Sequence, residues 1–104
     1  METPTHCTLC PRRCGADRTR THGLCGGGGM VKIARAALHF WEEPCISGTT
    51  GSGTVFFSGC NLRCCFCQNQ PISRGGVGKA ITPERLRQIF RELIDQGAAC
   101  LDLV

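Results

Sequence analysis

Several features that define common protein classes are missing from this sequence. No apolar run approaches the roughly 18 residues of a membrane span, so we expect a soluble protein with no membrane partner. Residues 1–20 hold Glu2, Asp17 and several arginines where a secretory signal would have an apolar segment. The four glycines at residues 26–29 lack the Lys-Ser/Thr pair of a phosphate-binding loop, and we interpret them as a flexible joint.

Cysteine, in contrast, is abundant, with ten in 104 residues. A small secreted domain stapled by disulfides would also be rich in cysteine. Here the cysteines fall in C-x2-C and C-x3-C clusters, which favour metal binding. Without a secretory signal, this pattern predicts a reducing, cytoplasmic location. The formal net charge of +4 fits an anionic partner but does not require nucleic acid, and we favour an ordinary solvated arginine face.

The most informative motif runs from Cys60 to Cys67. Cys60, Cys64 and Cys67 are spaced C-x3-C-x2-C, and Cys65 falls in a spacer position. A cubane 4Fe-4S cluster offers four irons, so three closely spaced thiolates leave one iron open to a small molecule with an amine and a carboxylate. An electron-transfer ferredoxin closes that position with a fourth cysteine, in runs such as C-x2-C-x2-C-x3-C-P, and no such run exists here. A zinc site or a disulfide pair are the alternatives.

A second set of cysteines lies in residues 1–29, which we predict to be a separate metal-binding leader. Its members are Cys7, Cys10, Cys14 and Cys25, spaced C-x2-C-x3-C-x10-C. Either tetrahedral zinc or an iron–sulfur cluster would fold a segment with so few apolar residues, and the spacing does not separate the two metals. The alternative is a disordered leader with free thiols. His6 and His22 are possible ligands, but we expect them to be exposed.

Residues 30–104 carry the pattern of an α/β core. Residues 30–40 suit either a strand or a short helix, Trp41 is expected to be half-buried, and residues 47–53 are a turn-rich linker. Residues 54–57 predict a fully buried strand that leads directly into Cys60. In barrels the chemistry lies at the carboxyl ends of such strands. Residues 68–70 (Gln-Asn-Gln) are either a polar loop or partners of the cluster sulfurs.

A helix is predicted to begin at Thr82, which is followed by Pro83 and Glu84. Its apolar stripe repeats at helical spacing and comprises Leu86, Ile89, Phe90, Leu93 and Ile94. Gly97 ends it, and residues 98–104 begin a second strand, so strand, helix and strand predict a parallel β-α-β unit. A full α/β barrel takes about 250 residues, so we expect this chain to be the N-terminal piece of a longer protein.

The motif Cys60, Cys64, Phe66 and Cys67 resembles the C-x3-C-x-aromatic-C signature of the radical S-adenosylmethionine (radical SAM) enzymes. The resemblance implies that the three cysteines bind a 4Fe-4S cluster and that Phe66 lies near the adenine of SAM. It implies a partial (β/α) barrel and reductive cleavage of SAM to a 5′-deoxyadenosyl radical that abstracts hydrogen. The Gly-Gly-Glu motif that contacts the SAM amine in many members would lie beyond Val104.

Longer passages are similar to pyruvate formate-lyase activating enzyme-like proteins. They are residues 34–44, 46–49 and 51–64, with 7–14 and 23–25 in the leader. This likeness implies a flavodoxin or ferredoxin as electron donor and a glycyl-radical enzyme as a protein partner. We expect the chain by itself to be inactive. Two further classes stay open: a zinc-binding module that contacts nucleic acid through the leader, and a simple iron–sulfur electron carrier.

Overall fold

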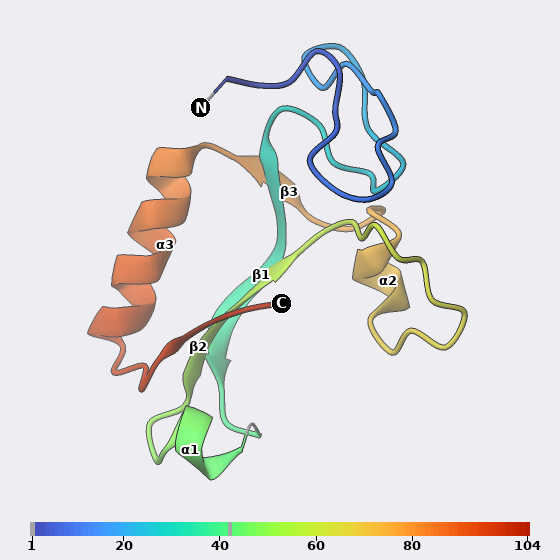
Figure 1. Cartoon of the computed structure of the whole chain (residues 1–104). Coiled ribbons are helices and arrows are strands. Elements are labelled where there is room, and N and C mark those ends of the chain that lie inside the picture. Colours follow the sequence, from blue (N-terminus) through green and yellow to red (C-terminus); the bar gives the residue numbers. More distant parts are fainter. Residues whose placement is uncertain (1, 42) are drawn as a thin grey trace.

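The computed structural model describes residues 2–41 and 43–104 as a mixed α/β arrangement (Figure 1). Residues 2–30 form turns and loops without a helix or strand. The elements that follow are β1 (Val31–His39), α1 (Pro44–Ser47), β2 (Ser52–Phe57), α2 (Gln70–Ser73), β3 (Lys79–Ile81), α3 (Pro83–Asp95) and β4 (Leu101–Leu103). Within the described residues, no helix has the length and apolar character needed to cross a membrane.

The strands form one mixed sheet in the order β3-β1-β2-β4. β1 lies in residues 30–40, for which the sequence predicts either a strand or a short helix. It pairs antiparallel with both β2 and β3. β2 and β4 pair in parallel, with α3 between them along the chain, so the predicted β-α-β unit is confirmed. The sheet as a whole is not parallel, because β1 enters between β2 and β3. The last strand is also shorter than the predicted residues 98–104.

The core lies between the sheet and α3, which covers one face of it (Figure 1). Ile33, Val55 and Leu93 are buried there, and Phe57 and Phe90 pack against them. The buried part of β2 is residues 52–55, whereas Phe56 and Phe57 are only partly buried. The prediction that residues 54–57 are fully buried was therefore wrong for the two phenylalanines. Phe56 points to the sheet face opposite α3, since neighbouring side chains in a strand alternate between faces.

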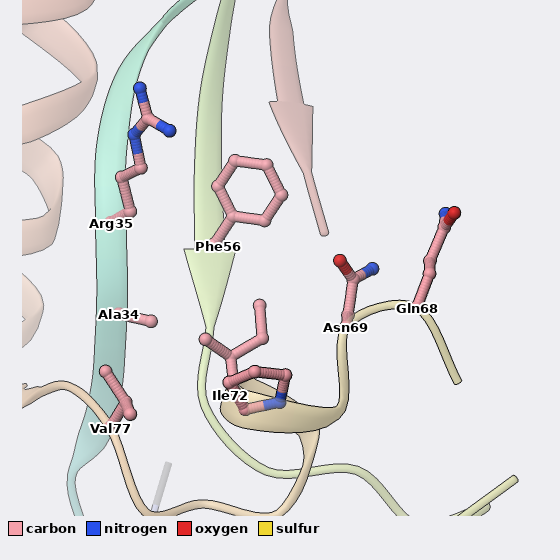
Figure 2. Close-up of a pocket in the computed structure, with 8 residues that line it drawn as sticks. Ala34, Arg35, Phe56, Gln68, Asn69, Ile72 and Val77 are labelled. Atoms are coloured by element: carbon pink, nitrogen blue, oxygen red, sulfur yellow. The ribbon is translucent and has the colours of Figure 1, made fainter. Parts of the chain in front are cut away.

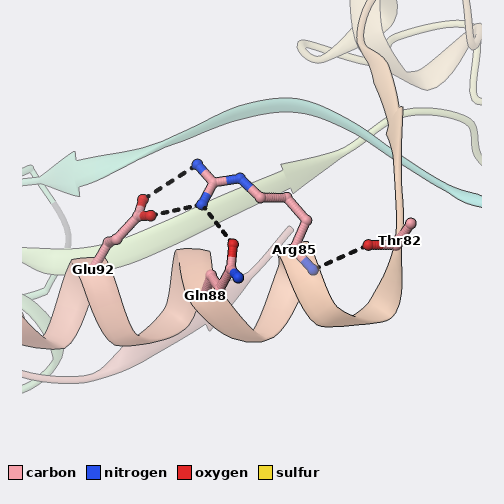
Figure 3. A network of polar contacts seen from close by, with 4 residues as sticks. All are labelled: Thr82, Arg85, Gln88 and Glu92. Carbon is pink, nitrogen blue, oxygen red and sulfur yellow. Dashed lines mark hydrogen bonds and ion pairs between the residues drawn. The ribbon is translucent and has the colours of Figure 1, made fainter.

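Both ends of α3 are capped as the sequence predicts. At its start the Thr82 hydroxyl accepts a hydrogen bond from the backbone N–H of Arg85 at 3.2 Å, and Arg85 pairs with Glu92 at 2.6 Å on the exposed face (Figure 3). At its end Gly97 has φ 92°, and the N–H of Ala98 donates to the carbonyl of Leu93 at 3.1 Å. This is the Schellman arrangement that favours glycine.

Three local predictions were wrong. Trp41 is not half-buried, because 91% of it is exposed. The expected linker at residues 47–53 is shorter, since α1 extends to Ser47 and β2 already begins at Ser52. Ile94 is exposed and does not belong to the buried stripe of α3. α1 lies at the opposite end of the sheet from the loop that carries Cys60 (Figure 1).

Candidate metal centre

The loop that carries the three predicted cluster ligands follows β2 and ends at α2 (Figure 1). Gly59 makes its first turn with φ 93°, and a Cβ at this position would collide with the carbonyl oxygen of Cys25. The backbone N–H of Gly59 donates to the carbonyl of Ile72 at 2.8 Å. The N–H of Cys60 donates to the carbonyl of Cys25 at 3.0 Å. A glycine is therefore required where the loop passes between the leader and α2.

Cys60 stands in an environment that favours its thiolate. The backbone N–H of Leu62 lies 3.5 Å from its sulfur. The hydrogen bond from Leu62, and then that from Arg63, lower the pKa of the Cys60 thiol, while burial opposes the change. Arg63 has φ 60°, a left-handed conformation that is uncommon for a residue other than glycine. Because thiolates are the ligands of iron–sulfur clusters, this turn prepares Cys60 for binding.

The other cysteines of the loop and Phe66 differ in how exposed they are to solvent. Cys64 and Cys67 are partly buried, and the Cys67 thiol lies 3.6 Å from the hydroxyl of Ser73. Cys65 is exposed, and Phe66 is 85% exposed. The three predicted ligands are thus less exposed than Cys65 and Phe66, the two residues between Cys64 and Cys67. All ten cysteines are free, so the disulfide alternative is not found.

The structure does not show an assembled metal shell. Among residues 2–41 and 43–104, no group of three or more Cys, His, Asp or Glu side chains is arranged to hold a metal ion. What it does show for Cys60, Cys64 and Cys67 is one short loop with three free thiols of suitable chemistry. The three thiols therefore have the chemistry and the spacing along the chain that a cluster requires.

Two arginines join the leader to this loop in opposite directions. Arg12 of the leader donates from Nε to the carbonyl of Asn61 at 2.7 Å and from its terminal nitrogen to that of Leu62 at 3.0 Å. Arg63 of the loop donates to the carbonyl of Leu24 at 2.7 Å. Sequence reasoning missed both arginines as parts of the site. Nothing in their spacing distinguishes them from other surface arginines.

A cavity of about 320 Å³ lies beside the loop, on the sheet face opposite α3. Its lining residues are Ala34, Arg35, Phe56, Gln68, Asn69, Pro71, Ile72 and Val77 (Figure 2). Gln68 and Asn69 directly follow Cys67, and Figure 2 shows Asn69 on the segment that leads into α2. Two of the three residues expected as a polar loop or cluster neighbours therefore line a cavity. Its size is at the small end of the range for ligand pockets, roughly 300–1,000 Å³.

A bulge in β1 supplies the charged side chain of this cavity. Ile33 is opposite Phe57 in the register, but Arg35 is opposite Phe56, so Ala34 is the extra residue. Residues opposite each other share a face of the sheet, and Phe56 faces away from the core. Without the extra residue, alternation would point Arg35 toward the core. The bulge instead places its guanidinium on the face that bears the cavity (Figure 2).

Three of the four leader cysteines lie near Arg18, and the fourth lies near the cluster loop. Arg18 donates from Nε to the Cys7 sulfur at 3.0 Å and from its terminal nitrogen to the Cys25 sulfur at 3.3 Å. The backbone N–H groups of residues 16 and 24 lower the pKa of the Cys14 thiol, and the charge of Arg18 adds to the effect. For Cys10, the N–H of residue 12 and the side chain of Asn61 lower the pKa. Three thiols therefore lie around Arg18, while Cys10 faces the loop. His6 and His22 are exposed, as predicted.

Comparison with known proteins identifies the class of this site. The family of the 4Fe-4S single cluster domain matches residues 46–104, which is more than half of the chain and includes Cys60, Cys64 and Cys67. The chain belongs to this family and is an iron–sulfur cluster-binding protein. The match favours iron over zinc at the loop, as the sequence predicts. The leader cysteines lie outside the matched residues.

One similar protein is an uncharacterized protein of Methanocaldococcus jannaschii. It is 35% identical over 79 residues, which are 73% of this chain and 21% of that protein. The chain thus spans about a fifth of the length of the curated relative that it matches. No solved structure matches the chain.

Proposed function

We propose that this chain is the cluster-binding part of a radical SAM enzyme of the activating-enzyme type. The observation that carries the proposal is the difference in exposure among the loop cysteines, of which Cys60, Cys64 and Cys67 are partly buried and Cys65 is exposed. Three partly buried cysteines match the count of a cluster that keeps one iron for an external ligand. A closed electron carrier needs a fourth thiolate, and the exposed side chain of Cys65 is poorly placed to supply it.

The position of the loop supports the same proposal. It follows the carboxyl end of β2, and β2 pairs in parallel with β4. Ligand sites in parallel sheets lie at the carboxyl ends of strands, where side chains from neighbouring loops converge. In our proposal β2, α3 and β4 are the first units of a partial (β/α) barrel, and the longer protein supplies the rest.

The residues of the chain have defined tasks in this proposal. Cys60, Cys64 and Cys67 would hold the cluster, and the hydrogen bond from the backbone N–H of Leu62 to the Cys60 sulfur stabilises the thiolate form of Cys60. A reduced 4Fe-4S cluster held by these cysteines would supply the electron for reductive cleavage of SAM. Phe66, exposed beside the third ligand, offers a ring for the adenine to stack on. Arg35 and Asn69 offer polar groups to a ligand in the neighbouring cavity.

The reaction class that we propose is hydrogen abstraction, with a glycyl-radical enzyme as the protein substrate. This reaction requires no general acid or base, so the chain's work is to bind, orient and shield. The electron would come from a flavodoxin or ferredoxin in the cytoplasm. Because this chain covers 21% of its relative, we expect turnover only in the full-length protein.

The test is anaerobic expression of the full-length protein, reconstitution with iron and sulfide, reduction and addition of SAM. Formation of 5′-deoxyadenosine and a change in the electron paramagnetic resonance of the reduced cluster would support the proposal. A protein that reduces reversibly but does not respond to SAM would be an electron carrier. A protein that takes up zinc and no iron would be the zinc-binding module. Cys45→Ser is the matched control for the ligand variants, because Cys45 is exposed on α1.

A further inference from the structure

The cavity beside the cluster loop is lined by three polar side chains, those of Arg35, Gln68 and Asn69. In the part of the chain that the structure describes, none of these side chains makes a hydrogen bond or an ion pair. The backbone of Asn69 is occupied in contrast, because its carbonyl accepts from the N–H groups of Ile72 at 3.1 Å and Ser73 at 2.9 Å. The three polar side chains are therefore available to a ligand.

Arg35 reaches the cavity through the bulge at Ala34, at the cost of an interrupted ladder between β1 and β2. The register places Arg35 opposite Phe56, and residues opposite each other share a face of the sheet. In the view of Figure 2 the ring of Phe56 lies between the side chains of Arg35 and Asn69. The lining thus has a cationic end on β1, an apolar middle and an amide end beside the cluster loop.

The apolar part of the lining is anchored to the segment that begins the cluster loop. The carbonyl of Ile72 accepts from the backbone N–H of Gly59 at 2.8 Å, and the carbonyl of Val77 accepts from the hydroxyl of Ser58. The apolar lining residues are Ala34, Phe56, Pro71, Ile72 and Val77. Because backbone contacts hold two of them in place, the cavity is formed before a ligand enters it.

The charge of the lining indicates which ligand would fit. Among the described residues that line the cavity, Arg35 carries the only charge, and none is an Asp or Glu. One guanidinium balances one negative charge, and its planar N–H groups match the two oxygens of a carboxylate. A phosphate monoester carries about −1.5 to −2 charges at neutral pH, so part of its charge would remain unbalanced. The cavity therefore favours a monocarboxylate with an apolar body.

We propose that this cavity binds an organic monocarboxylate, with Arg35 paired to the carboxylate and Phe56 against the apolar body. The rest of the ligand extends toward Gln68 and Asn69, which directly follow Cys67. The role of the ligand rests on the proposed function, in which the carboxylate belongs to the substrate and orients it toward the cluster. A free organic acid and an acidic side chain of a protein substrate carry this same chemistry.

The test is calorimetric titration of the full-length protein without SAM or reductant, so that binding is measured apart from SAM cleavage. The probes are 3-phenylpropanoate, its neutral amide 3-phenylpropanamide, and 2-phenylethyl phosphate. We expect the carboxylate to bind at least 10-fold more tightly than either of the others. Arg35→Gln should weaken carboxylate binding by roughly 10-fold or more, as for other hydrogen bonds to charged groups. Arg87→Gln is the matched control, because Arg87 is exposed on α3, across the sheet from the cavity.

Arg35→Glu provides a measurement that a loss of folding would not mimic. It should abolish binding of 3-phenylpropanoate and create binding of 3-phenylpropylamine, whose ammonium group complements the new carboxylate. Acetyl-Phe-Glu-amide separates the two sources of the carboxylate. Binding of this peptide that Arg35→Gln weakens would indicate a protein side chain, and binding of 3-phenylpropanoate alone would indicate a free acid.

Three outcomes would overturn the proposal. They are unchanged binding in Arg35→Gln, equal or tighter binding of the amide or the phosphate, and displacement of 3-phenylpropanoate by SAM from the cluster-loaded protein. Displacement would show that the cavity is part of the SAM site. If the carboxylate binds through Arg35 but SAM is not cleaved, the proposed function fails and the carboxylate site stands. If SAM is cleaved but no carboxylate binds, the reverse holds.

Discussion

The backbone N–H of Cys60 donates a hydrogen bond to the carbonyl oxygen of Cys25 at 3.0 Å. This contact joins the last cysteine of the leader to the first cysteine of the cluster loop, 35 positions later in the chain. Each of the two residues is therefore held partly by the other's segment. Changes in the leader should consequently be measurable at the cluster, and four predictions follow from this and the neighbouring contacts.

The first prediction concerns Gly59. Changing it to Ala would add a Cβ that collides with the Cys25 carbonyl, at a residue with φ 93°. We expect loss of most of the bound iron after reconstitution, because the loop can no longer pass the leader. A left-handed conformation alone costs a non-glycine residue about 1 kcal/mol or more. Gly76→Ala is the matched control, since a Cβ there meets nothing within 4 Å. Equal iron content in both variants would contradict this role of Gly59.

The second prediction concerns Arg12. Replacing it with Gln removes the guanidinium that contacts the carbonyls of Asn61 and Leu62. Because both contacts are exposed, we expect a loss of about 1 kcal/mol, which corresponds to several-fold faster release of iron to a chelator. Arg87→Gln, on the exposed face of α3, is the control. If both variants release iron at the rate of the unchanged protein, the arginine does not hold the loop.

The third prediction separates ligands from neighbouring cysteines. Cys64→Ser and Cys67→Ser should each reduce cluster content strongly, whereas Cys65→Ser should leave it unchanged, because Cys65 is exposed. Cys10 is the leader thiol that faces the loop through Asn61, so Cys10→Ser tests whether a fourth thiolate closes the cluster. We expect the spectrum of the reduced cluster, with and without SAM, to be the same in Cys10→Ser as in the unchanged protein. A spectrum altered in the absence of SAM would identify Cys10 as a ligand.

The fourth prediction concerns pH. Hydrogen bonds from Leu62 and Arg63 lower the pKa of the Cys60 thiol in the folded chain. Because the pKa is lower in the folded chain, the ionised Cys60 thiol stabilises the folded state above the unfolded pKa, about 8.5. This contribution is lost as the pH falls through the folded pKa. In the cluster-free protein, alkylation of Cys60 should therefore persist to lower pH than in the unfolded chain. The check is the pH profile of alkylation, followed by mass spectrometry of the Cys60 peptide, in native and denatured protein. Superimposable profiles would contradict it.

Much of the site was predictable because its determinants are local. The spacing of Cys60, Cys64 and Cys67 keeps them on one short segment whatever the fold. The start of α3 follows from Thr82 and Pro83, since a cap needs only the residues of the first helical turn. The Schellman end at Gly97 depends on local backbone conformation in the same way.

Other features were beyond the sequence because they depend on distant partners. Residues 31–39 became a strand through pairing with β2 and β3, and the bulge at Ala34 directed Arg35 to the cavity. Trp41 was expected to be half-buried, but it is 91% exposed and follows the end of β1 at His39.

The sequence by itself determined the chemistry of this protein, namely three thiols on one loop, a second set of four in the leader and a capped helix. Only the tertiary structure decided how the parts meet, with Cys25 against Cys60 and with Arg12 and Arg63 crossing between leader and loop. The physical reason is that these contacts end on backbone carbonyls. Every residue carries a carbonyl, so the sequence holds no mark of which one an arginine will reach.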